Sequence, residues 1–275
     1  MAVVGLFLAG GLGFALAQSF GLFALVGEPE LTLRHYGDLL GDADFGAAML
    51  LSLRLSLVST AISLVISLGM AMLLRRRVRG DGPLRLLFQL PLPVPHLVAA
   101  VGIALLVSQS GLVARLLFAA GLLHDRADFP LLVNDPFGAG IVLVYVWKEV
   151  PFVTLLLLAA LTGIGEQLEA AARTLGASAW QRFRHVTLPL LLPAMLSSGL
   201  IVFAFTFGAF EVPYVLGRTY PKAVSVFAWE RFSDVDLNQR PQAMAASVLI
   251  TLFAAGVAVA YAALLRRSAH VTSDK

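Results

Sequence analysis

Residues 166–193, EQLEAAARTLGASAWQRFRHVTLPLLLP, decide the architecture, because this polar, helix-prone segment lies between two long apolar runs. The three alanines at 170–172 are strong helix formers. Gly176 can take the left-handed backbone conformation that ends a helix. The first half of the segment therefore predicts a helix that stops at a glycine turn.

The second half of the segment predicts another short helix. Ser178 followed by Gln181 has the spacing of a capping box. A helix starting there places Trp180 and Phe183 on one face, and Pro189 fits the first turn of the helix that follows. A helix–turn–helix of this kind can press into a groove on a partner protein; the alternative is an ordinary amphipathic linker at the membrane surface.

Composition predicts an integral membrane protein. The chain is 59% hydrophobic and only 13% charged, with a mean hydropathy of +0.85, whereas soluble domains carry about 25% charged residues. There is no cysteine, which excludes disulfides and thiol chemistry, and the five histidines show no metal-ligand spacing. The net charge of +3 fits membrane orientation rather than nucleic-acid binding, because the cations cluster beside the apolar runs.

Six apolar runs are long enough to cross a bilayer, and they predict an all-α, six-helix bundle forming one transmembrane domain over residues 1–275. The expected spans are 2–25, 47–74, 86–108, 138–162, 188–215 and 242–265. The first is weighed against a signal peptide ending near 15–17, but it lacks the basic residue that precedes the apolar part of such a peptide.

Basic residues in the loops predict that both termini and the loop at 163–187 are cytoplasmic. They gather after the second, fourth and sixth spans, at 75–77, 79, 85, 173, 182, 184, 266, 267 and 275. The loop near 216–240 conflicts with this pattern, because it would be external and yet carries Arg218, Lys222, Arg231 and Arg240.

Polar residues inside the expected spans are candidates for a solute path. Serines at 52, 56, 59, 63 and 67 share one helical face, which indicates either close helix packing or a polar wall. Lys148 and Glu149 are intramembrane charges, which mark function unless each has a structural partner. Glu211 lies between Gly208 and Pro213, where an irregular helix near the outer side is expected; its alternative role is a structural pair with Lys148 or Arg54. The residues expected to line a path are Lys148, Glu149, Glu211, Tyr214, Ser59 and Ser63.

The 166–193 segment resembles the cytoplasmic EAA loop of the membrane subunits of bacterial ABC importers. In that family Glu-Ala-Ala is followed after three residues by Gly, and after nine more by an aliphatic residue, any residue and Leu-Pro. Gly176 is followed at that distance by VTLP at 186–189, but Ala170 occupies the acidic position and Glu169 lies one place early. WKEVPF at 147–152 and FGAFEVPYVLG at 207–217 are similar to the spermidine/putrescine, iron, thiamine and sulfate branch.

The resemblance implies a type I importer permease in the bacterial cytoplasmic (inner) membrane. Its implied partners are a cytoplasmic ABC ATPase dimer, a second permease subunit that is a different chain, and an extracytoplasmic solute-binding protein. No Walker A pattern occurs, so ATP and magnesium are expected on the ATPase, and no cofactor or catalytic residue on this chain. The solute is expected to be small and polar or charged, with a weak leaning to polyamines. The implied ATPase-coupling residues, within 166–187, are Glu169, Ala170, Ala171, Arg173, Gly176, Ala177, Ser178, Trp180 and Phe183.

Two other functions are compatible with the residues alone. One is a membrane receptor or scaffold without transport. The other is an intramembrane enzyme that uses Lys148, Glu149 and His96, although no motif places these three together. Stimulation of a partner ATPase by a binding protein would distinguish a transporter from both.

Overall fold

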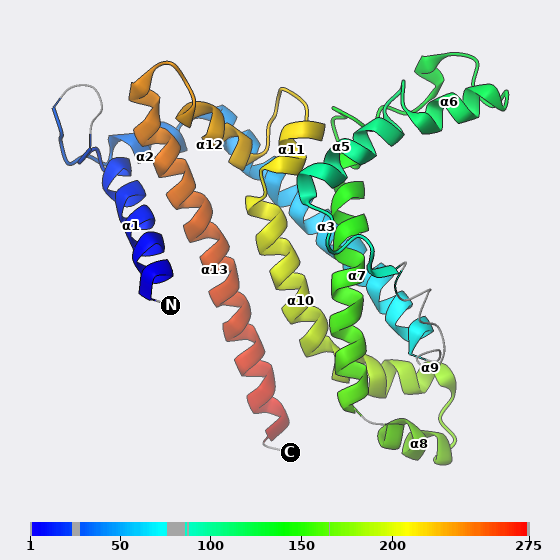
Figure 1. Ribbon diagram of the computed structural model, residues 1–275. Helices are drawn as coiled ribbons and strands as arrows, with labels where there is room; N and C mark the ends of the chain where they lie inside the picture. Colours follow the sequence, from blue (N-terminus) through cyan, green and yellow to red (C-terminus); the bar gives the residue numbers. More distant parts are fainter. Residues whose placement is uncertain (1, 24–27, 76–85, 87, 165, 274–275) are drawn as a thin grey trace.

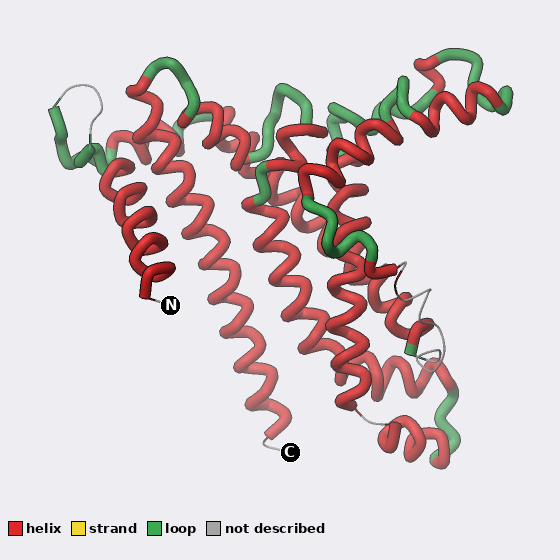
Figure 2. Tube along the Cα trace, in the orientation of Figure 1, coloured by secondary structure: helices red, strands yellow, loops and turns green. Residues whose placement is uncertain are grey.

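The computed structural model is a bundle of helices joined by turns (Figure 1, Figure 2). It describes residues 2–23, 28–75, 86, 88–164 and 166–273, and no strand occurs among them. The helices are α1 (Ala2–Ser19), α2 (Arg34–Leu40), α3 (Ala43–Leu74), α5 (His96–Val107), α6 (Leu112–Ala119), α7 (Ala139–Ile164), α8 (Glu166–Thr174), α9 (Ala179–Arg182), α10 (Leu188–Gly208), α11 (Glu211–Leu216), α12 (Val224–Phe232) and α13 (Arg240–Ser273), with short 3-10 turns at Arg126–Asp128 and Leu237–Gln239 and a π-helical turn at Phe183–Thr187.

The predicted all-α membrane fold is confirmed. Within the described residues, five helical stretches are long and apolar enough to cross a membrane, and a shorter apolar helix precedes them at Val3–Ser19. The five are Ala43–Leu74, His96–Ala119, Ala139–Thr162, Ala179–Gly208 and Leu237–Tyr261. The first expected span is the short one, because α1 ends before a turn in which Gly21 has φ +77°.

Prolines and glycines explain where the other spans differ from the prediction. The third span begins at His96 rather than near 86, because Pro91, Pro93 and Pro95 have no backbone N–H to donate to a helix. The fifth ends at Gly208, and the chain restarts as α11, which confirms the expected irregularity there. Arg76, Arg77, Arg79 and Arg85, which supported the predicted orientation, lie outside the described residues.

α3 is the central helix of the bundle, since it packs along both α7 and α10. Gly199 of α10 permits the close approach, because a Cβ there would lie 3.0 Å from Leu64 Cδ1 of α3. α13 packs against α1, α10 and α12. Outward-facing apolar side chains along the spans, such as Leu57, Val65 and Leu252, give the bundle the surface that lipid tails require.

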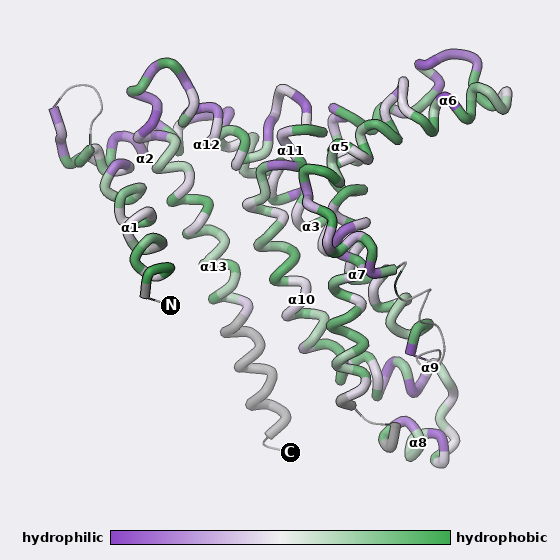
Figure 3. The backbone as a smooth tube through the Cα atoms, in the orientation of Figure 1, coloured by the Kyte–Doolittle hydropathy of each residue, from purple (hydrophilic) through white to green (hydrophobic). Residues whose placement is uncertain are grey.

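The two ends of the bundle carry different elements (Figure 1). α8 and α9 lie at the end toward which α13 runs, whereas α2, α11 and α12 lie at the opposite end. α5 and α6 extend sideways from that second end. Polar residues gather in the segments at the two ends, and the long helices between them are mainly apolar (Figure 3). The predicted cytoplasmic segment and the predicted external loops are therefore on opposite sides.

Candidate functional site

α8 ends as the sequence predicts. Two nested hydrogen bonds close it, from the Ala177 N–H to the Ala172 carbonyl (3.0 Å) and from the Gly176 N–H to the Arg173 carbonyl (3.0 Å). Gly176 has φ +81°, the left-handed conformation that this type of helix ending uses. The turn direction between α8 and α9 is therefore set by one glycine.

α9 begins with the predicted capping box. The Ser178 N–H donates to Gln181 Oε1 (2.8 Å), and the Gln181 N–H donates to Ser178 Oγ (3.3 Å). This helix is not the separate short helix that was expected, because it continues through the π-helical turn into α10. Pro189 gives the physical reason, because it cannot donate to the carbonyl four residues earlier, and a π turn accommodates the lost bond.

Glu169 fastens α8 to two other helices. Its carboxylate accepts two hydrogen bonds from the Arg75 guanidinium at the end of α3, at 2.6 and 2.7 Å. Thr187 Oγ1, just before α10, donates to Glu169 Oε1 at 2.5 Å. The hydrogen bonds from Arg75 are the main reason that the pKa of Glu169 lies below its ordinary value. Sequence reasoning missed both partners, because they lie far from Glu169 in the chain.

The segment presents apolar side chains away from the bundle. Leu175 at the glycine turn is 87% exposed and Trp180 on α9 is 65% exposed. The Trp180 ring packs against Phe183 with centroids 5.6 Å apart, which confirms that they share a face. Arg173 and Ala171 are exposed, whereas Ala170 and Ala177 are half-buried. A rigid turn with exposed apolar anchors is a surface suited to binding a protein groove.

Lys148 binds backbone, not an acid. Its ammonium, on a residue only 5% exposed, donates to the carbonyls of Pro91 (2.6 Å), Leu92 (3.3 Å) and Val94 (2.5 Å). These carbonyls belong to the proline-rich turn before α5, where helical partners are missing. The lysine thus ties that turn to α7, and its expected role in a solute path stays a prediction.

Glu149 points to a different neighbour from Lys148, as expected for adjacent positions on a helix. It is buried, and its Oε1 lies 3.5 Å from His96 Nε2 at the start of α5. The His96 ring packs on Phe205 of α10, with centroids 4.7 Å apart. The carboxylate and the imidazole therefore meet where α5, α7 and α10 converge.

Glu211 and Tyr214 are exposed on α11. Glu211 makes no ion pair with any described residue, so the predicted alternative of a pair with Lys148 or Arg54 is not found. Arg54 instead donates to the carbonyls of Pro136 and Phe137 (2.9 and 3.1 Å). Aromatic rings lie beside α11, since Phe210 packs on both Tyr214 (ring centroids 4.9 Å apart) and Trp229 (5.6 Å).

The serine face of α3 is buried inside the bundle. All five serines are 0–2% exposed. Ser52 Oγ accepts from the Val224 N–H (2.8 Å), and Ser67 Oγ donates to the Val150 carbonyl (3.0 Å). The hydroxyls of Ser59 and Ser63 have no hydrogen-bond partner among the described residues. The arrangement fits close helix packing, and a path role for Ser59 and Ser63 stays a prediction.

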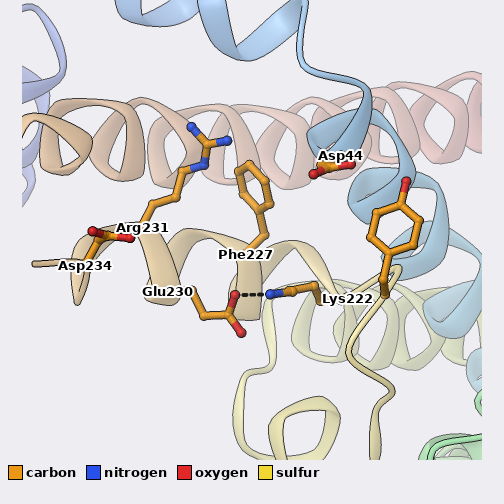
Figure 4. Close-up of a pocket in the computed structure, with 7 residues that line it drawn as sticks. Asp44, Lys222, Phe227, Glu230, Arg231 and Asp234 are labelled. Carbon is orange, nitrogen blue, oxygen red and sulfur yellow. Dashed lines mark hydrogen bonds and ion pairs between the residues drawn. The ribbon is translucent and has the colours of Figure 1, made fainter. Parts of the chain in front are cut away.

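A charged cleft lies beside α12 (Figure 4), at the end of the bundle opposite α8 (Figure 1). It is lined by Asp44, Tyr220, Lys222, Phe227, Glu230, Arg231 and Asp234. Lys222 pairs with Glu230, and Arg231 pairs with Asp42 at 2.5 Å while lying over the Phe227 ring. Two basic residues of the 216–240 loop, which conflicted with the predicted orientation, are thus held by acids in α12 and before α3. Spacing alone did not indicate these pairs.

These features define a helical membrane protein with several spans and a rigid, exposed helix–turn–helix at one end. The family model for the binding-protein-dependent transport system inner membrane component matches residues 63–270. The match covers most of the chain, and the chain belongs to this family. This family consists of membrane components of transport systems. The alternative of an intramembrane enzyme that uses Lys148, Glu149 and His96 is therefore not supported.

Curated relatives extend this assignment. The trehalose/maltose transport system permease MalF of Thermococcus litoralis is 32% identical over 192 residues, covering 69% of this chain and 63% of that protein. The trehalose permease SugA of Mycobacterium tuberculosis is 32% identical over 201 residues, covering 72% and 63%. The molybdenum permease ModB of Azotobacter vinelandii is 32% identical over 199 residues, covering 72% and 84%.

The chain thus spans about 63% of the length of the two sugar permeases. The relatives are named for sugars and molybdenum rather than for spermidine or thiamine, so they do not support the finer branch suggested by residues 147–152 and 207–217.

Solved structures agree on the fold. A bacterial ABC transporter that imports the acidic polysaccharide alginate has a chain with a TM-score of 0.78 and 21% identity, covering 97% of this chain and 93% of that one. The same kind of transporter, in complex with an alginate pentasaccharide-bound periplasmic protein, gives a TM-score of 0.74 and 20% identity.

Proposed function

We propose that this chain is the membrane-spanning subunit of an ATP-driven importer and that the segment 166–187 docks on a separate ATPase. Membership of the transport-component family supports the first part. The second part rests on one observation: the segment forms a turn fixed by Gly176 and a capping box, with Leu175 and Trp180 exposed on it. Exposed apolar anchors on a rigid element lose little entropy when they bind.

The other partners follow from the same proposal. A second permease subunit completes the path, and a solute-binding protein delivers the solute at the end of the bundle that carries α11 and α12. The periplasmic protein bound to the alginate transporter supports this for the fold. In this proposal the segment 166–187, which docks on the ATPase, lies in the cytoplasm, together with the end of the bundle toward which α13 runs.

The solute path is proposed to pass Glu211 and Tyr214. Both side chains are exposed at the break between α10 and α11, and irregular backbone at membrane depth is tolerated where it lines a cavity. Glu149 and His96 lie deeper, where α5, α7 and α10 meet. Closure of the ATPases would shift the bundle between two arrangements, as in other alternating-access systems.

A neutral, sugar-like solute is the proposed class. Two of the relatives belong to trehalose and maltose systems. The exposed rings of Tyr214 on α11 and Trp229 on α12 can cover the apolar face of a sugar ring, and Glu211 can accept hydrogen bonds from its hydroxyls. A carboxylate at this place repels a molybdate-like oxyanion. The earlier leaning to polyamines rested on acidic residues alone and is not retained.

Reconstitution with the ATPase, the second permease and the binding protein tests the proposal. Uptake of labelled trehalose, molybdate and spermidine into vesicles is measured in parallel, with and without ATP. ATP-dependent uptake of the sugar is expected. Uptake of molybdate or spermidine instead would overturn the solute class, and failure of the ATPase to copurify would overturn the coupling role.

A further inference from the structure

The carboxylate of Glu169 accepts three hydrogen bonds from within the subunit. Oε1 accepts from Arg75 and from Thr187, and Oε2 accepts a second bond from Arg75, over distances of 2.5–2.7 Å. Charge-assisted and two-pronged bonds of this length are the strong ones. The three residues come from α8, from the end of α3 and from the turn that starts α10, so one side chain joins three elements.

The acid faces the bundle and the docking surface lies elsewhere on the segment. The Glu169 and Arg75 side chains are each 25% exposed, whereas Leu175 and Trp180 are mostly exposed. Thr187 is 1% exposed, so no partner protein can reach its hydroxyl. Ala170, at the position where the related loops have their acid, offers no charge to a partner.

We infer that Glu169 is a positioning residue that makes α8 move as one unit with the ends of α3 and α10, rather than a contact to the ATPase. This inference rests on the proposed docking role of the segment. A rigid joint is required there, because a displacement of α8 by a partner reaches the spans only through elements packed or bonded to it. α3 is the central helix of the bundle, and α10 runs from this joint to the break before α11. The joint therefore connects the docking segment to the proposed solute path.

Thr187→Val is the decisive variant. Valine keeps the shape of threonine, and position 187 is buried, so the change removes one bond to Glu169 without touching a partner surface. Thr162→Val is the control, because among the described residues the Thr162 hydroxyl bonds the Ala159 carbonyl of its own helix and no other group. Glu169→Gln and the double variant complete a cycle that tests whether the two residues act together.

Three properties of the complete complex in lipid nanodiscs are measured for each variant: the amount of ATPase retained on the permease, ATP hydrolysis without and with the binding protein, and the melting temperature. Glu169→Gln and Thr187→Val are expected to retain the ATPase. Stimulation by the binding protein should fall about fivefold or more for Glu169→Gln, within the usual range of coupling between sites, and less for Thr187→Val. The double variant should lose no more than Glu169→Gln alone, and Thr162→Val should behave as the wild type.

Other outcomes overturn the inference. If Glu169→Gln releases the ATPase while Thr187→Val has no effect, Glu169 is a direct contact. If both variants only lower the melting temperature and the folded complex couples normally, the bonds are merely structural. Trp180→Ala tests the docking proposal separately from the role of Glu169. If this variant retains as much ATPase as the wild type, the segment does not dock through Trp180, and the bonds of Glu169 to Arg75 and Thr187 are unaffected.

Discussion

Gly176 allows a quantitative test of the docking turn. Its φ of +81° costs an ordinary L-residue about 1–2 kcal/mol, more for a β-branched one, and little for asparagine, which tolerates this region. A Cβ at Gly176 would meet nothing within 4 Å. Substitution therefore introduces no clash, and the whole effect comes from backbone conformation.

The expected order of ATPase affinity is Gly and Asn, then Ala, then Val. An energy of 1–2 kcal/mol corresponds to a factor of about 5–30 in the population of the docking-competent turn, and this factor should appear in the dissociation constant of the ATPase. Binding is measured on purified permease variants by titration with the ATPase, and membrane insertion should be unchanged. If Gly176→Val binds the ATPase as tightly as Gly176→Asn, the turn does not control docking.

Three further outcomes follow from the buried and exposed charges. Lys148→Met should destabilise the subunit by about 3 kcal/mol, because buried carbonyls lose their donor, whereas the surface control Lys222→Met should cost at most about 1 kcal/mol; equal melting temperatures for the two variants would contradict the role of Lys148. Glu211→Gln should lower uptake while the complex assembles normally, since no described cation is left unpaired; lost assembly would indicate a structural role, and normal uptake in a stable complex would remove Glu211 from the path. The pKa of Glu169 is lowered on folding from its ordinary value of 4.5. The stability that its ionised carboxylate contributes is therefore present above pH 4.5 and disappears as the pH falls through the lowered pKa. The difference in melting temperature between the wild type and Glu169→Gln should thus stay constant near neutrality and vanish in acid; a difference that does not depend on pH would contradict this.

Local signals in the sequence predicted the docking segment well. Gly176 as a helix end and Ser178 as a cap depend on residues within a few positions, and the structure confirms both. The prediction of a separate short second helix was wrong, because α9 continues through a π turn into α10. Pro189 is the one sequence signal for that turn. Span boundaries failed where prolines or glycines interrupt apolar runs, as they do before His96 and after Gly208.

Long-range partners were beyond the sequence. The sequence showed Lys148 as an intramembrane charge, but its hydrogen-bond acceptors are backbone carbonyls of residues 91–94. Every residue has a backbone carbonyl, so the side-chain pattern could not indicate these acceptors. Arg75, which binds Glu169, and Asp42, which binds Arg231, are distant in the chain from the residues they bind. A local sequence pattern therefore could not predict these pairs. The serine periodicity identified a helical face correctly, yet periodicity alone could not distinguish a packed face from a polar wall.

Site-directed photo-crosslinking tests the central claim, that the segment 166–187 contacts the ATPase. The chain has no cysteine, so Leu175→Cys and Val235→Cys each provide a unique site for a maleimide photo-crosslinker. Leu175 is 87% exposed at the glycine turn, and Val235 is 98% exposed in the loop between α12 and α13. That loop is at the opposite end of the bundle from α8. Illumination of the assembled complex should join the ATPase to position 175 and not to position 235. No ATPase adduct at 175, or equal adducts at both positions, would contradict the account.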